Sequence, residues 1–167
     1  AQEAKLRIIC SKLQLNKHDR IVEIGSGWGG FAIYAAKNYG CHVTTTTISD
    51  EQYAHVKKRI VEEELTNNIA LLKRDYRDME GEFDKLVSVE MIEAVGSQFL
   101  DTYLKKCSSL LKPDGVMLLQ AITIQDQRYD RAPKSVDFIQ KYIFPGGFIP
   151  SVTAVVESAR RVSDLRL

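Results

Sequence analysis

A run of glycines after a short apolar segment is the first feature of this sequence that could do chemistry. The apolar segment is 20–24, and Gly25, Gly27 and Gly30 follow it in the spacing G-x-G-x-x-G. Glycine lets a backbone turn tightly and approach a ligand without a Cβ clash. This spacing after a strand is typical of dinucleotide-binding turns, and folds that bind S-adenosylmethionine (SAM) use a similar turn. The motif therefore predicts a nucleotide-like cofactor without choosing between the two.

Two neighbouring features favour SAM over a nicotinamide dinucleotide. Glu23 lies just before the turn, where a carboxylate suits the α-ammonium group of a methionine but would repel a pyrophosphate. The next predicted strand ends in the threonines 44–47, not in an acid that could bind a ribose. Asp50 lies about 20 residues beyond the glycines, so the dinucleotide alternative stays open. The same aspartate also suits the first turn of a helix.

Length and composition fit one globular domain over residues 1–167. The chain is 44% hydrophobic and 27% charged, which excludes intrinsic disorder. The 23 Lys and Arg nearly balance the 22 Asp and Glu, so we expect no nucleic-acid partner. No run approaches the ~20 apolar residues of a transmembrane helix.

The three cysteines, Cys10, Cys41 and Cys107, are widely spaced and form no C-x-x-C pair. We therefore expect buried reduced thiols, a cytoplasmic protein and no metal site.

Short apolar segments alternate with helical ones along the whole chain. We expect strands at 20–24, 41–48, 69–72, 83–89 and 116–124, and helices at 1–15, 29–39, 49–65, 97–111, 135–142 and 152–162. A turn is expected at 113–115. This alternation predicts an α/β, Rossmann-like fold with a mostly parallel, doubly wound sheet and helices on both faces.

Polar residues near the ends of the fourth and fifth predicted strands are a second candidate site. In a parallel sheet, ligands bind beyond the carboxyl ends of the strands. Glu90 and Glu93 follow the fourth strand in an apolar stretch, and Gln120 interrupts the fifth. Because buried carboxylates and amides need partners, we expect Glu93 and Gln120 to line a site. The alternatives are carboxylates facing water at a helix start and a satisfied core amide.

Three further motifs, together with the glycine turn, carry a family resemblance. They are Tyr76-Arg77-Asp78, the sequence EMIEAVG at 90–96 and the sequence YIFPGG at 142–147. Over about residues 1–155 the chain resembles the cyclopropane-fatty-acyl-phospholipid synthases and the related mycolic acid cyclopropane synthases, which are SAM-dependent methyltransferases. It resembles a core segment that lacks the N- and C-terminal flanks of that family.

The resemblance implies SAM as the cofactor, with residues near its methionine end, its ribose and its adenine. The residues carried over are Glu23, Gly25, Ser26, Gly27, Trp28, Gly29, Thr47, Ile48, Gln52, Tyr76 and Arg77. An aromatic wall beside a flat base also supplies stacking area, which is an independent reason for Tyr76.

The resemblance also implies a reaction. The SAM methyl carbon adds to a cis double bond of an unsaturated phospholipid acyl chain, and a bound bicarbonate removes a proton as a cyclopropane ring closes. Glu93, Gln120 and the backbone of Ile122 correspond to the contacts of that bicarbonate. The family has a histidine where this chain has Gln120, and glutamine does not titrate near neutral pH.

Several alternatives remain at this stage. The same cation could yield a methyl or methylene branch, as in a fatty-acyl C-methyltransferase, and the chain could bind SAM without turnover. A nicotinamide oxidoreductase and a small-molecule or protein methyltransferase also fit the fold. The apolar segment 138–149 suits an acyl-pocket wall, a shallow membrane contact or ordinary packing. We expect acyl chains at a membrane surface as partners, with peripheral contact at the inner membrane face and a homodimer left open.

Overall fold

The computed structural model describes residues 2–129 and 147–166. By its internal contacts the chain divides into two compact units. Unit 1 comprises Ala1–Ser88 and Ser109–Leu119, and unit 2 comprises Val89–Ser108 and Gln120–Leu167. This division leaves the single-domain interpretation of residues 1–167 as a prediction.

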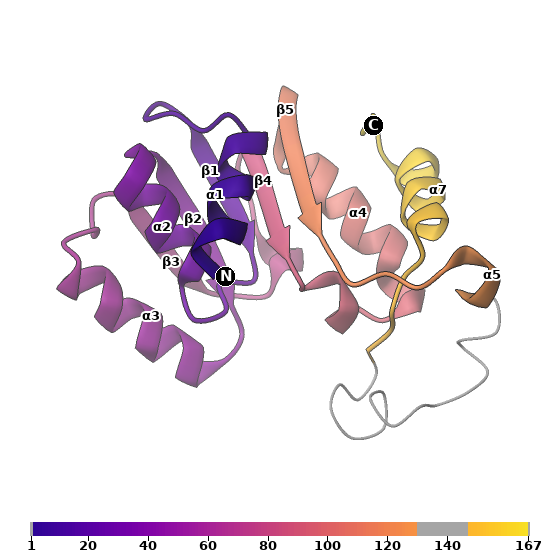
Figure 1. Cartoon of the computed structure of the whole chain (residues 1–167), viewed down its shortest axis with the longest axis horizontal. Coiled ribbons are helices and arrows are strands. Elements are labelled where there is room, and N and C mark those ends of the chain that lie inside the picture. Colours follow the sequence, from indigo (N-terminus) through magenta and orange to yellow (C-terminus); the bar gives the residue numbers. More distant parts are fainter. Residues whose placement is uncertain (1, 130–146, 167) are drawn as a thin grey trace. The chain divides into compact units, whose positions relative to one another are not determined.

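Unit 1 is built on a five-stranded sheet with the strand order β3-β2-β1-β4-β5 (Figure 1). The strands are β1 (Arg20–Ile24), β2 (His42–Thr47), β3 (Ile69–Lys73), β4 (Phe83–Val89) and β5 (Leu111–Gln120). β1 pairs in parallel with β2 and β4, and β2 pairs in parallel with β3. The arrows of β4 and β5 run in the same direction in Figure 1. The predicted α/β, Rossmann-like fold is confirmed, and its strand order reverses between β1 and β4.

The helices of unit 1 begin and end close to their predicted positions. They are α1 (Gln2–Lys12), α2 (Gly30–Tyr39) and α3 (Asp50–Glu62), and the short 3-10 turn η1 covers Tyr76–Asp78. α2 lies between Gly29 and Gly40, whose φ angles of 82° and 68° are left-handed and favour glycine. Ser49 is the N-cap of α3, and its Oγ accepts a hydrogen bond from the N–H of Gln52 at 3.2 Å.

Unit 2 contains short turns and helices joined by polar contacts. The elements are η2 (Ile92–Ala94), η3 (Ser97–Phe99), α4 (Leu100–Ser109), α5 (Asp126–Tyr129) and α7 (Val152–Val162). Asp101 on α4 accepts hydrogen bonds from Ser158 Oγ at 2.5 Å and Arg161 Nη2 at 2.6 Å, so α4 and α7 are held side by side (Figure 1). The predicted helix at 152–162 is confirmed. The predicted helix at 135–142 and the YIFPGG motif lie wholly or mainly outside the described residues.

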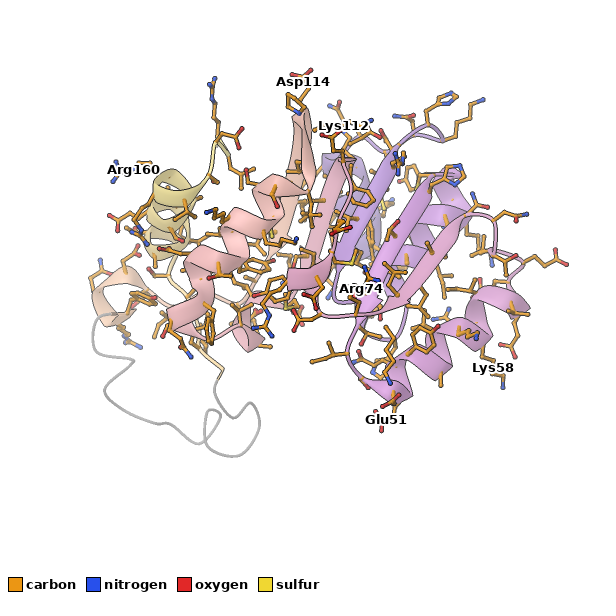
Figure 2. The ribbon with its side chains drawn as sticks, turned by 180° about the vertical axis from the view of Figure 1, so that it is seen from behind. Glu51, Lys58, Arg74, Lys112, Asp114 and Arg160 are labelled. Carbon is orange, nitrogen blue, oxygen red and sulfur yellow. The ribbon has the colours of Figure 1, made fainter. Side chains whose placement is uncertain are left out.

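The predicted start and end of the fifth strand are wrong. β5 runs from Leu111 to Gln120, through the stretch 113–115 that was expected to be a turn. Its first half is fixed by the start of β4: Lys112 Nζ lies 2.6 Å from Asp84 Oδ1, and the N–H of Phe83 donates to the carbonyl of Leu110 at 2.9 Å. Figure 2 shows Lys112 and Asp114 at this outer end of β5. Hydropathy along the chain cannot detect these partners, because they lie far away in sequence.

Gly29 is the residue of the glycine turn that lies against both α2 and α3. A Cβ at this position would lie 3.1 Å from Ile33 Cδ1 and 3.2 Å from Val56 Cγ1, so a side chain would push between α2 and α3. At Gly30, the next residue, a Cβ would have no atom within 4 Å, and its φ is not left-handed. Two adjacent glycines therefore have different roles.

This difference gives a stability prediction. Gly29→Ala should lower the free energy of unfolding by about 2 kcal/mol, through the left-handed φ and the crowding between the helices. Gly30→Ala is the matched control, and it should change that free energy by less than about 1 kcal/mol. Urea unfolding of the two variants measures both values. Equal losses for the two variants would contradict the structural account of Gly29.

Candidate functional site

The residues expected to bind a cofactor gather at one edge of the sheet in unit 1. Ile24 on β1 is in register with Thr46 on β2, and Thr46 is in register with Leu72 on β3. The segments that follow these strands therefore leave the sheet at the same edge. We call the following residues the cofactor cluster: Glu23, Gly25, Ser26, Gly27, Trp28, Gly29, Thr47, Ile48, Gln52, Tyr76 and Arg77.

The glycine turn is closed on itself and tied to β2. Gly25, Gly27 and Gly29 have φ angles of 90°, 49° and 82°. The N–H of Ser26 donates to the carbonyl of Thr46 at 2.7 Å, and the N–H of Gly29 donates to the carbonyl of Ser26 at 2.9 Å. A Cβ at Gly27 would have no atom within 4 Å. The turn is thus fixed by its glycines and leaves open space for a ligand to approach its backbone.

Glu23 presents a buried carboxyl directly before this turn. It is only 2% exposed, and its Oε2 accepts a hydrogen bond from Thr45 Oγ1 at 2.6 Å. Burial raises the pKa of the Glu23 carboxyl to about 8, although the hydrogen bond from Thr45 lowers it. At neutral pH the carboxyl is therefore mostly protonated, and a nearby cation would favour its ionised form. Sequence analysis did not identify Thr45 as a partner of Glu23. The two residues are paired in register between β1 and β2.

Thr47 and Gln52 contact one another where β2 leads into α3. Thr47 Oγ1 donates to Gln52 Oε1 at 2.8 Å and accepts from the N–H of Ser49 at 3.2 Å. A complete capping box would require the side chain of Gln52 to bond to the backbone N–H of Ser49. Here that side chain bonds to Thr47 instead. Ile48, between them, is 74% exposed and offers an apolar surface at the same edge.

Tyr76 and Arg77 follow β3 in η1. The guanidinium of Arg77 binds both carboxylate oxygens of Asp75, with Nε to Oδ1 at 2.9 Å and Nη2 to Oδ2 at 2.7 Å. This pairing lowers the pKa of Asp75. Arg77 is therefore already paired as a cation, which leaves Tyr76, partly exposed, as the aromatic surface of this segment.

Trp28 is part of the glycine turn and contacts α3. The residue is 58% exposed, and its ring meets the ring of His55 edge-on, with 5.3 Å between the centroids. Arg59 Nη1 donates to the carbonyl of Trp28 at 3.2 Å. Both partners come from α3, so this helix holds the turn in place through polar and aromatic contacts. Sequence analysis did not identify His55 or Arg59 as partners of the turn.

The second group of predicted residues lies in unit 2, and we call it the acceptor cluster: Glu93, Gln120 and Ile122. Glu93 is in η2, and its Oε1 accepts a hydrogen bond from the N–H of Ile122 at 2.6 Å. Within the described part of the chain, Glu93 Oε2 and Gln120 Oε1 are buried and have no hydrogen-bond partner. The structure thus joins Glu93 to the backbone of Ile122, and it joins the carbonyl of Gln120 to the N–H of Glu90 at 2.8 Å.

The described residues contain no group of three or more His, Cys, Asp or Glu side chains that could hold a metal ion. Within the same part of the chain, no helix is long and apolar enough to cross a membrane. Cys10, Cys41 and Cys107 are free and buried. The prediction of buried reduced thiols is therefore confirmed.

Comparison with known proteins gives the fold and the site a context. A solved structure of the mycolic acid cyclopropane synthase CmaA1, complexed with SAH and CTAB, matches with a TM-score of 0.87 and 29% identity over 96% of this chain and 60% of that one. The cyclopropane-fatty-acyl-phospholipid synthase of Escherichia coli K12 is 42% identical over 159 residues. The tuberculostearic acid methyltransferase UfaA1 of Mycobacterium tuberculosis is 35% identical over 167 residues.

These matches differ in how much of each protein they cover. The chain aligns over 95% and 100% of its own length with the two curated relatives, but it spans only 40% and 39% of theirs. The family model of mycolic acid cyclopropane synthetase matches residues 1–166. Because that model spans almost the whole chain, and the CmaA1 structure matches with a TM-score of 0.87, the chain belongs to the mycolic acid cyclopropane synthetase family.

Proposed function

We propose that this chain binds SAM through the cofactor cluster and is the methyl-transferring part of a lipid-modifying enzyme. The proposed enzyme adds the SAM methyl carbon to a cis double bond of an unsaturated phospholipid acyl chain and closes a cyclopropane ring. The observation that carries the proposal is the buried carboxyl of Glu23 beside a glycine turn with open space at Gly27. The matched E. coli synthase and the SAH-bound CmaA1 structure support it.

The residues of the cofactor cluster fit the distinct parts of SAM. In the proposal, the Glu23 carboxyl takes the α-ammonium group, and the open backbone at Gly27 admits the methionine chain. Ile48 and Tyr76 supply apolar and aromatic surface for the adenine, and the Thr47–Gln52 pair lies nearest the ribose. Bound SAM supplies an electrophilic methyl carbon on a positively charged sulfur. A pyrophosphate would instead meet the Glu23 carboxyl, so a nicotinamide dinucleotide fits less well.

The substrate side of the proposal rests on the relatives. The curated relatives that match include a cyclopropane-fatty-acyl-phospholipid synthase, the tuberculostearic acid methyltransferase and a probable fatty acid methyltransferase of Pseudomonas putida. Their names share a fatty-acyl substrate and differ in product. A second candidate function is therefore fatty-acyl C-methylation that leaves a methyl or methylene branch. Either reaction needs access to acyl chains, so the proposal includes peripheral contact with a membrane surface.

Binding of S-adenosylhomocysteine (SAH) tests the role of Glu23. Because the pKa of its carboxyl is about 8, pairing with an ammonium requires loss of a proton at lower pH. SAH affinity should therefore rise between pH 6 and pH 8, by up to about tenfold per pH unit. Glu23→Gln should lower the affinity at pH 8 by about tenfold or more and flatten this dependence. Isothermal titration calorimetry at pH 6, 7 and 8 measures both effects.

The matched control is Glu82→Gln, which makes the same change at an exposed carboxylate before β4, at the opposite end of the strands from the cofactor cluster. This variant should bind SAH as the unmodified protein does at every pH. A flat pH profile for the unmodified protein, or equal affinities for both variants, would contradict the assignment of Glu23. No heat with SAH in any of the three proteins would overturn the proposed function itself.

Turnover on lipid tests the product. The protein is incubated with methyl-labelled SAM and vesicles of phospholipids that carry one cis double bond in an acyl chain. We expect label in the lipid and a gain of one CH2, with no double bond left for ozone to cleave. A gain of CH2 with an ozone-sensitive bond would favour the methylene branch. SAH binding without label in the lipid would favour a SAM-binding segment without turnover.

A further inference from the structure

Arg59 on α3 connects the glycine turn to a charged network between two helices. Its Nη1 donates to the carbonyl of Trp28 at 3.2 Å, and its Nη2 donates to Glu63 Oε1 at 2.9 Å. Lys37 on α2 donates to the other carboxylate oxygen, Glu63 Oε2, at 3.1 Å. The hydrogen bonds from Lys37 and Arg59 lower the pKa of Glu63, so this carboxylate is ionised at neutral pH. The network joins α2, α3 and the turn, which all belong to unit 1.

The peptide unit between Trp28 and Gly29 is held at both of its polar groups. Because a peptide unit is planar, the Trp28 carbonyl and the Gly29 N–H turn together. The N–H donates to the carbonyl of Ser26 at 2.9 Å, and the carbonyl accepts from Arg59. The hydrogen bonds of α2 begin one residue later, where the N–H of Ile33 donates to the carbonyl of Gly29 at 3.1 Å. Helix α2 therefore does not fix the Trp28 carbonyl, whereas Arg59 does.

The turn needs this support because glycines flank Trp28 on both sides. Gly27 and Gly29 have left-handed φ angles of 49° and 82°. Glycine adopts positive and negative φ about equally well, so the peptide units beside Trp28 can rotate at low cost. Rotation of the Trp28–Gly29 unit would break both of its hydrogen bonds and change the backbone next to the open space at Gly27. The ring contact with His55 holds the side chain of Trp28 and not this peptide unit.

Arginine suits this position for a geometric reason. A guanidinium is a rigid plane with donors on separate nitrogens, so it bonds the carbonyl of Trp28 and the carboxylate of Glu63 at the same time. Lysine has one ammonium on a flexible stem and does not hold two partners in a fixed plane. The Arg59 side chain is 35% exposed, so water competes for its donors and its loss should have a modest effect.

We propose that Arg59 is a positioning residue for the cofactor, which holds the Trp28–Gly29 peptide in the orientation that lets the glycine turn receive SAM. This inference rests on the proposed function. Arg59 acts through the turn and makes no contact with SAM, and Glu63 acts by orienting Arg59. Loss of Arg59 should therefore weaken cofactor binding and leave unchanged the pH dependence that comes from Glu23.

Three single substitutions on α3 test this role through SAH affinity. Arg59→Gln removes the charge, and Arg59→Lys keeps the charge one helical turn before Glu63. Lys58→Gln is the matched control, because Lys58 is 75% exposed and pairs with Glu62 at 3.6 Å (Figure 2). Calorimetry at pH 6 and pH 8 should show affinity lowered about fivefold to tenfold in Arg59→Gln and at least about threefold in Arg59→Lys. Lys58→Gln should bind SAH as the unmodified protein does, and all variants should keep the rise in affinity with pH.

The fluorescence of Trp28 supplies a readout that needs no ligand, because Trp28 is the only tryptophan of the chain. Time-resolved anisotropy should show a larger fast component in Arg59→Gln and Arg59→Lys than in the unmodified protein or Lys58→Gln. Bound SAH should reduce this difference. Circular dichroism checks that each variant is folded. In folded variants, a merely structural role of Arg59 would leave both the anisotropy and the affinity unchanged.

The possible outcomes separate this proposal from the proposed function. Unchanged SAH affinity in both Arg59 variants, or an equal loss in Lys58→Gln, would overturn the positioning role. Full affinity in Arg59→Lys with a loss in Arg59→Gln would assign the effect to charge alone and would also overturn it. If the unmodified protein does not bind SAH, the proposed function fails instead, and the anisotropy of Trp28 still shows whether Arg59 holds the turn.

Discussion

The parallel pairing of β1 with β2 is the constraint on which the rest of this structure depends. Their register sets Glu23 opposite Thr45, which gives a carboxyl buried between two strands a single hydroxyl donor at 2.6 Å. Burial favours the neutral, protonated form of this carboxyl, and the hydrogen bond from Thr45 favours the ionised form. Burial has the larger effect, so the pKa of Glu23 is raised to about 8. The same register aligns the ends of β1, β2 and β3, so the segments after them share one edge. The cofactor cluster is thus a consequence of strand alignment.

Glycine has two separate functions where β1 leads into α2. At Gly29 the left-handed backbone and the nearby side chains of Ile33 and Val56 demand a residue without Cβ, so this glycine serves the packing of α2 against α3. At Gly27 the backbone is also left-handed, but the space around it is open. The left-handed φ alone favours glycine at this position, because other residues are strained there. The open space leaves the backbone of Gly27 accessible, as the proposed function requires.

The features that follow from local chemistry were predictable from the sequence. Some features depend only on residues that are close together in the chain. They are the glycines at the two ends of α2, the Ser49 cap of α3, and the strands β1 and β4. The start of β5 was not predictable, because Lys112 is held by Asp84 and Leu110 by Phe83 across the sheet. The same limit applies to Thr45, which becomes a partner of Glu23 only once the register is known. The composition of unit 1 and unit 2 likewise depends on contacts between distant segments.

The hydrogen bonds of unit 2 show why the pairing of Glu93 with Ile122 needs the fold to be seen. Glu93 in η2 follows β4, and its Oε1 accepts a hydrogen bond from the N–H of Ile122, which follows β5, at 2.6 Å. The carbonyl of Gln120 at the end of β5 accepts from the N–H of Glu90 at 2.8 Å. The segments after β4 and β5 are therefore joined by two hydrogen bonds between residues about 30 positions apart. A carboxylate and a backbone N–H so far apart in sequence become partners only once the two strand ends lie together, so hydropathy along the chain does not indicate this contact.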